Sequence, residues 1–235
     1  MKKKMVFSIM TLLAGSLLAA DASPKDEITS AAKKLAQQAN YSWRTTVAVP
    51  EGSRFRPGPT EGKTEKDGFT CLTLSFGENT TQAVLKGNKG AVTNPEGRWQ
   101  SLADLDSAEG PGRFMGRMLR DFKAPTAQAS DLLASVKELK KDGDVYSGDL
   151  TEDGAKAMLS FGRRGGGEAP TVTKPKGSVK FWVKDGVLTK YEFKVQGTVE
   201  FNGNQRDVDR TTTVEIKDVG TTKTDVPEEA KKLLS

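Results

Sequence analysis

The fold is decided by residues 179–216, which read VKFWVKDGVLTKYEFKVQGTVEFNGNQRDVDRTTTVEI. Apolar and polar residues alternate over three successive runs, and this alternation is typical of β-strands with one buried and one exposed face. Two pairs, Asp185-Gly186 and Asn202-Gly203, separate the runs and favour tight hairpin turns, whose central residues need positive φ. The middle run is predicted to place on one apolar face Val187, Tyr191, Phe193, Val195, Val199 and Phe201.

Shorter strands are predicted upstream of this stretch. The chain alternates with a period of two over residues 41–49, 69–76 and 80–86. Two further turn pairs, Asp67-Gly68 and Asp142-Gly143, mark hairpins. A sheet of about eight or more strands, some of them roughly 12 to 15 residues long, has to twist and curl. We therefore expect an α+β fold built on a strongly curved antiparallel sheet or partial barrel.

Helices are predicted around and between these strands. Ser23 and Pro24 are typical of an N-cap and a first helical residue, and small apolar residues recur after them at helical spacing. A helical insert is expected at about 111–139, between the two sets of strands. Thr151 is expected to cap a further short helix over 151–161, and residues 227–234 are expected to form a terminal one.

The first 22 residues have the pattern of a secretory signal peptide. Three lysines at positions 2–4 precede an apolar run over residues 5–18, and the small-x-small motif Ala20-Asp21-Ala22 follows. The apolar run is too short for a bilayer core, which takes about 20 helical residues. We expect cleavage after Ala22 or Ala20, leaving a single domain over residues 23–235. Residues 13–16 resemble a lipid-attachment box, but Ser16 lacks the thiol for acylation, so we expect a soluble, exported, periplasmic protein without a lipid.

Composition excludes several classes of function. The chain of 235 residues has no histidine and one cysteine, Cys71, so Ser-His-Asp and Cys-His nucleophile systems, His-ligated metal sites and CxxC redox centres cannot be assembled. Removing residues 1–22 takes three lysines and one aspartate, which lowers the formal net charge from +5 to about +3. No basic stripe interleaved with aromatic residues is present, so we expect no nucleic-acid partner.

Three weaker patterns bear on catalysis, metal binding and phosphate binding. Asp207 and Asp209 alternate between two arginines, which permits paired-carboxylate catalysis but is more typical of a solvated cross-strand charge pattern. Aspartates at 142, 144 and 149 lack the spacing of a calcium loop, and the glycine-rich residues 162–167 lack the ending of a phosphate loop. We therefore expect no enzyme activity, no metal site and no cofactor.

The order of these parts resembles the lipoprotein-carrier superfamily of LolA, LppX and LprG type. The local similarity lies in residues 85–90 leading to Gly97-Arg98-Trp99, in residues 181–187 leading to Lys190-Tyr191, and in the closing segments 211–220 and Val226-Pro227. This resemblance covers nearly all of residues 24–235. It implies a curved half-barrel whose concave face encloses an apolar cavity under helices, and a lipid or an acylated protein as the ligand.

The candidate ligand-binding residues are large apolar side chains of the insert and of the strands. They are Trp43, Phe114, Met115, Met118, Leu119, Phe181, Tyr191 and Phe193. Methionine reshapes around irregular apolar ligands, although the same periodicity is equally expected of an ordinary core. Two functions therefore stay open. One is an exported carrier or sensor of a lipid or other amphiphile, and the alternative is an envelope structural or protein-interaction module with a filled core and a transient envelope protein partner.

Overall fold

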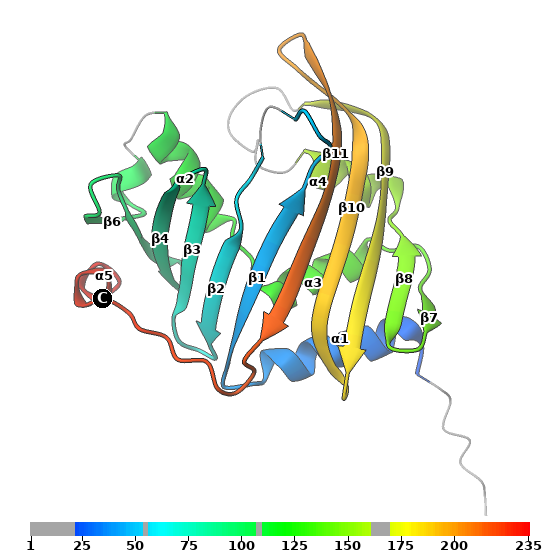
Figure 1. Ribbon diagram of the computed structural model, residues 1–235, viewed down its shortest axis with the longest axis horizontal. Helices are drawn as coiled ribbons and strands as arrows, with labels where there is room; N and C mark the ends of the chain where they lie inside the picture. Colours follow the sequence, from blue (N-terminus) through cyan, green and yellow to red (C-terminus); the bar gives the residue numbers. More distant parts are fainter. Residues whose placement is uncertain (1–21, 54–55, 107–109, 161–169) are drawn as a thin grey trace, which may run out of the picture.

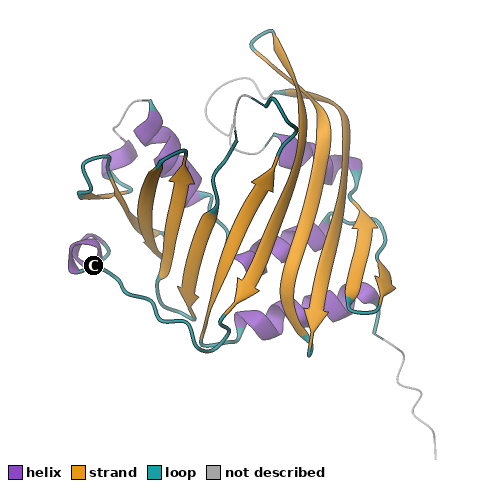
Figure 2. Cartoon of the chain, viewed as in Figure 1, coloured by secondary structure: helices purple, strands orange, loops and turns teal. Residues whose placement is uncertain are grey.

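One antiparallel sheet dominates the computed structural model, which describes residues 22–53, 56–106, 110–160 and 170–235. The predicted signal peptide, apart from Ala22, and the glycine-rich segment 162–167 lie outside the described residues. Within them the sheet has eleven strands in the order β6-β5-β4-β3-β2-β1-β11-β10-β9-β8-β7. The sheet is open and curved, and helices α1 to α4 lie on one of its faces (Figures 1 and 2). The α+β fold class expected from the sequence is confirmed.

The strands form two meanders that meet where β1 pairs with β11. The first meander comprises β1 (Asn40–Ala48), β2 (Thr60–Glu65), β3 (Thr70–Phe76), β4 (Asn79–Lys86), β5 (Lys89–Thr93) and β6 (Trp99–Ser101). The second comprises β7 (Lys140–Asp142), β8 (Val145–Asp149), β9 (Thr171–Lys184), β10 (Val187–Phe201) and β11 (Asn204–Lys217). Three of the four predicted turn pairs lie between consecutive strands, whereas Asp142 ends β7 and pairs with Val145, so the β7–β8 turn is Gly143-Asp144 rather than the predicted Asp142-Gly143. The alternation in the sequence does not predict the short strands β5 to β8.

Helices lie at the predicted places, except that the insert predicted to run to about residue 139 is helical only as far as Ala134. They are α1 (Pro24–Ala36), α2 (Pro111–Arg120), α3 (Pro125–Ala134), α4 (Glu152–Leu159) and α5 (Glu228–Leu233), with a 3-10 turn η1 (Asp104–Asp106) before α2. The Ser23 hydroxyl accepts from the Asp26 amide at 3.2 Å, and the Thr151 hydroxyl accepts from the Gly154 amide at 3.0 Å. Both hydroxyls therefore cap the first turn of a helix, as expected.

The main core lies between the sheet and helices α1, α3 and α4. Its largest fully buried side chains include Tyr191, Phe181, Ile28 and Leu35. A second, smaller cluster lies on the opposite face, where Ala230 of α5 packs with Val84 and Ala91. Because Val84 and Ala91 alternate with Ala83 and Val92 of the main core, the two clusters lie on opposite sides of the same strands.

The structure corrects one detail of the middle strand. Leu188 is fully buried, whereas Val187, which the alternation predicted on the apolar face, is only half-buried. The pairing of β9 with β10 shifts register between Leu188 and Lys190, which indicates a β-bulge. A bulge inserts one residue into the alternation and reverses which residues face the core on its far side.

Candidate ligand pocket

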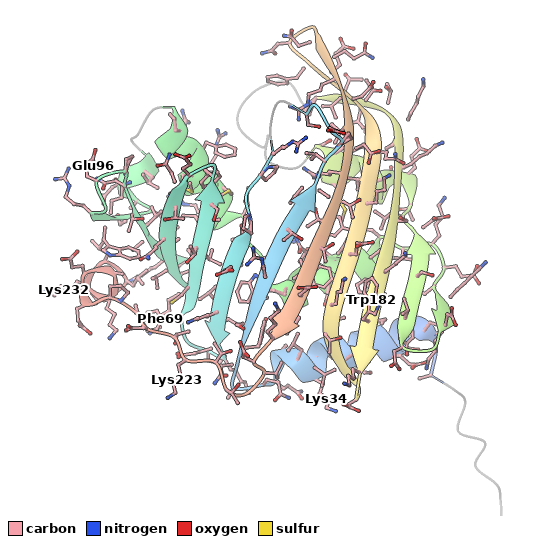
Figure 3. The ribbon with its side chains drawn as sticks, in the orientation of Figure 1. Lys34, Phe69, Glu96, Trp182, Lys223 and Lys232 are labelled. Atoms are coloured by element: carbon pink, nitrogen blue, oxygen red, sulfur yellow. The ribbon has the colours of Figure 1, made fainter. Side chains whose placement is uncertain are left out.

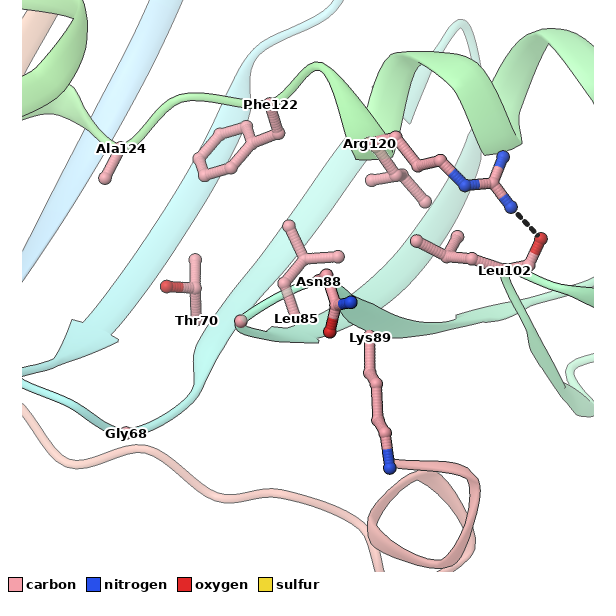
Figure 4. Close-up of a pocket in the computed structure, with 11 residues that line it drawn as sticks. Gly68, Thr70, Leu85, Asn88, Lys89, Leu102, Arg120, Phe122 and Ala124 are labelled. Carbon is pink, nitrogen blue, oxygen red and sulfur yellow. Dashed lines mark hydrogen bonds between the residues drawn. The ribbon is translucent and has the colours of Figure 1, made fainter. Parts of the chain in front are cut away.

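A pocket of about 400 Å³ lies between the end of α2 and strands β3 to β5 (Figure 4). Its lining comes from the β2–β3 turn, from β3, β4 and the start of β5 with the turn between them, from the segment before η1, and from the end of α2 and the segment that follows it. The lining residues are Gly68, Thr70, Leu85, Gly87, Asn88, Lys89, Leu102, Leu119, Arg120, Phe122 and Ala124. The pocket therefore lies on the helix-covered side of the first meander.

Part of the lining is apolar. Leu85 of β4, Leu102 before η1 and Leu119 of α2 present aliphatic side chains, and Phe122 adds an aromatic ring just beyond α2. The Phe122 ring stacks on Trp43 of β1, with ring centroids 6.2 Å apart and planes inclined by 20°. Because Trp43 is itself buried in the main core, the stack fixes this wall of the pocket to the sheet.

Another part of the lining is polar. The Lys89 ammonium donates to the Ser235 carbonyl at 2.6 Å, and the Arg120 guanidinium donates to the Leu102 carbonyl at 2.5 Å. Asn88 lies beside Lys89 in the β4–β5 turn (Figure 4). A lining with about as much polar as apolar surface has partners for both the hydrocarbon and the polar end of an amphiphile.

Four of the predicted site residues come from α2. Leu119 lines the pocket and is 3% exposed, whereas Met115 and Met118 are half-buried and pack against the main core. Phe114 is 49% exposed and does not line the pocket. Trp43, on β1, is adjacent to the pocket through its stack on Phe122.

The other three predicted site residues lie in the second meander. Phe181 and Tyr191 are fully buried, with ring centroids 6.3 Å apart, and Phe193 is buried as well. The Tyr191 hydroxyl donates to Gln128 Oε1 of α3 at 2.6 Å, and burial raises the pKa of Tyr191 well above its usual value. None of the three lines the pocket under α2, so the structure does not bring all eight predicted residues into one site.

Several pocket residues were missing from the predicted site. Leu85 lies in the alternating run over residues 80–86 and Phe122 in the predicted helical insert, but nothing in either pattern connects them across the sheet. Leu102 and the turn residues Asn88 and Lys89 carry no periodicity at all. The pocket depends on how α2 sits over the first meander, which is a tertiary property.

Asp207 and Asp209 have ordinary surface partners. The Thr198 hydroxyl donates to Asp207 at 2.7 Å, the Gln196 amide donates to Asp209 at 2.8 Å, and the Lys194 ammonium lies 3.2 Å from Asp209. These contacts are the solvated cross-strand pattern that the sequence favoured. Across the described ranges, no group of three or more Cys, Asp or Glu residues is arranged to hold a metal ion.

Comparison with solved structures finds related folds. The lipoprotein LppX of Mycobacterium tuberculosis matches with a TM-score of 0.48 and 10% identity, over 85% of this chain and 96% of LppX. LprF from Mycobacterium bovis matches with a TM-score of 0.47 and 11% identity, over 89% of this chain and all of LprF. The chain is similar in structure to LppX and LprF. LppX is also one of the proteins named by the sequence resemblance.

A third structure and two sequence comparisons complete these findings. A DUF1329 family protein from Desulfovibrio piger matches with a TM-score of 0.32 and 9% identity, over 82% of this chain and 89% of the other. No protein-family model matches the sequence, and no curated protein matches it. Within the described residues, no helix is long and apolar enough to cross a bilayer.

Proposed function

We propose that this protein is an exported, non-catalytic carrier or sensor that binds a lipid or other amphiphile in the pocket under α2. The observation that carries the proposal is a pocket of about 400 Å³ whose lining includes the apolar side chains of Leu85, Leu102, Leu119 and Phe122. Ligand pockets are typically about 300–1,000 Å³, whereas a close-packed core leaves only water-sized voids. Transfer of an acyl chain from water into this pocket is worth about 0.8 kcal/mol per CH₂ group.

Export is part of the same proposal. The pattern of residues 1–22 supports delivery across a membrane and removal of the leader, and Ser16 supports release without a lipid anchor. The periplasm is the compartment we propose, with a lipid or an acylated protein as the ligand. A protein that carries an insoluble ligand through water also has to hand it to a partner, so we propose transient contact with an envelope protein.

Binding is tested with protein purified from its own envelope and with a fluorescent fatty acid. We expect native mass spectrometry to show co-purified lipid, and Leu85→Glu to weaken fatty-acid binding by about tenfold or more, because the carboxylate must be desolvated against the ligand. Gln82→Glu is the matched control, since it places the same charge on an exposed position of β4. A ligand-free mass together with no fatty-acid binding would falsify the proposal.

The same proposal assigns α2 the role of a movable cover. The helix begins after Gly110, which has a φ of 62° and needs the freedom of glycine, and it leaves Phe114 half exposed. Among the described elements, its backbone lies closest to η1 rather than to a strand. A helix that opens would admit a ligand to Leu119 and Phe122 without unfolding the sheet.

The cover is tested with Met118→Asp. We expect the ligand-free variant to keep its thermal midpoint within about 10 °C of the parent while losing fatty-acid binding, because an opening helix can carry the carboxylate to water. Met118→Leu conserves volume and polarity and serves as the control. A larger fall for the aspartate variant would show that Met118 belongs to a closed core, and the cover would then be abandoned.

The second candidate is an envelope structural or protein-interaction module. It is favoured by the complete burial of Phe181 and Tyr191, because the helix-covered side of the second meander is filled by side chains. Cross-linking in the periplasm to one stoichiometric protein, with no lipid retained, is the result expected for this module. If the parent protein retains lipid and Leu85→Glu does not, the result favours the carrier over the protein-interaction module.

A further inference from the structure

A second pocket, of about 380 Å³, lies where the long β10–β11 hairpin extends past α4. Arg206, Val208 and Arg210 of β11 contribute to its lining, together with Val199 of β10 and Leu159 of α4. This pocket shares no lining residue with the pocket under α2. It is therefore a separate site, and the proposed function does not use it.

Strand alternation explains why both arginines face this pocket. Thr212, Val214 and Ile216 of β11 face the main core, so the residues at 206, 208 and 210 lie on the same side of the strand. Asp207 and Asp209 lie on the opposite face, where they accept hydrogen bonds from side chains of β10. The two carboxylates nearest in sequence are therefore turned away from the two guanidinium groups.

Among the described residues, no carboxylate compensates the charge of Arg210. One guanidinium nitrogen donates to the Met158 carbonyl at 2.8 Å, while Nε is buried and has no hydrogen-bond partner in the described part of the chain. Burial and, after it, the charge of Arg206 lower the pKa of Arg210. No carboxylate among the described residues forms an ion pair with either arginine. Arg206 is exposed, whereas Arg210 is partly buried, and a buried charge is costly until an anion compensates it.

Besides the arginines, the lining consists of apolar side chains and of Asn202 and Asn204 at the end of the hairpin. Val199, Val208 and Leu159 present aliphatic surface beside the arginines, and Leu159 is 9% exposed. Guanidinium groups bind carboxylate and phosphate oxygens in a bidentate manner, and aliphatic surface favours hydrocarbon. We propose that this pocket is an oxyanion site that holds the phosphate or carboxylate of an amphiphile at Arg206 and Arg210, with the adjoining hydrocarbon on Val199, Val208 and Leu159.

The test is calorimetric titration of the full protein, in a phosphate-free buffer, with octyl phosphate, inorganic phosphate and octyl glucoside. We expect octyl phosphate to bind more tightly than either of the other two, and Arg206→Gln to weaken it by about tenfold or more, since a charge-assisted hydrogen bond is lost. Arg206 is exposed, so its replacement leaves the fold intact. Arg44→Gln removes an exposed arginine of β1 and is expected to change nothing.

The arms of the experiment separate the possible sources of binding. Equal binding of inorganic phosphate and octyl phosphate, both lost in Arg206→Gln, would retain the oxyanion site but overturn the amphiphile. Equal binding of octyl phosphate and octyl glucoside, unchanged in Arg206→Gln, would overturn the site altogether. Leu85→Glu is expected to bind octyl phosphate like the parent. Loss of binding in the pocket under α2 is therefore distinguishable from loss of binding at the arginines.

Discussion

Replacing Phe181 with alanine is expected to lower the free energy of unfolding by about 3–5 kcal/mol. The ring is fully buried between β9 and the helices, and it lies 6.3 Å from the ring of Tyr191, centroid to centroid. The surrounding side chains include Tyr191, which is held by its hydrogen bond to Gln128 and cannot move freely into the void. The loss therefore combines the transfer energy of the ring with the energy of the remaining cavity.

Trp182→Ala provides the matched control in the same strand. Trp182 points to the face of the sheet turned away from α1 and α3, where the Lys190 ammonium lies 4.8 Å from its ring centroid (Figure 3). Because this ring is only half-buried, we expect a loss of about 1 kcal/mol or less. Urea unfolding of both variants, followed by circular dichroism, gives the two free energies.

The unfolding free energy of Phe181→Ala also tests which half of the sheet borders an open cavity. A loss below about 1 kcal/mol for Phe181→Ala would mean that the ring faces open space, and the second meander would then contain the ligand cavity. A loss in the expected range leaves the pocket under α2 as the place for an apolar ligand. The experiment therefore bears on function, although it measures only stability.

The long strands were predictable because two independent signals agreed. Alternation of period two identified the apolar face of β9, β10 and β11, and the pairs Asp185-Gly186 and Asn202-Gly203 located the turns between them. In the structure Asp185 and Asn202 have positive φ, as do the glycines that follow them. Such a turn fixes the register of both strands at once.

Local signals failed where an element was too short or where the alternation broke. Strands β6 and β7 have three residues each, which is less than two periods of a strand pattern. The bulge near Leu188 arises from the pairing with β9, so no single strand reveals it. Both failures have the same cause, because the determining contact is with another part of the chain.

The candidate site was less predictable than the fold. Periodicity identifies the apolar face of α2, but it does not say whether that face meets side chains or a void. Leu119 and Phe181 gave equally good patterns, yet one lines a pocket and the other is enclosed by the core. Arg206 and Arg210 were recognised only as the neighbours of two aspartates. Their shared pocket depends on the packing of α4 against the hairpin.

Gly62→Ala is expected to destabilise the protein by about 1–3 kcal/mol, through overpacking rather than through a cavity. Gly62 pairs with Trp43 in the β1–β2 register, and the indole lies across the glycine. A Cβ atom at position 62 would lie 2.1 Å from Trp43 Cζ2, so the ring has to move. The rings of Tyr41 and Phe122 pack against the indole, with ring centroids 5.8 Å and 6.2 Å away, and they oppose that movement.

The displaced ring connects this substitution to the pocket. Trp43 can move only by disturbing its stack with Phe122, which lines the pocket under α2, so we expect Gly62→Ala to weaken fatty-acid binding as well as stability. Lys63→Ala, at an exposed position of the same strand, should leave both unchanged. In the double variant with Trp43→Phe the smaller ring leaves room for the added methyl group, so its destabilisation should be less than the sum of the two single changes. Strict additivity would show that the glycine is required for a reason other than the indole.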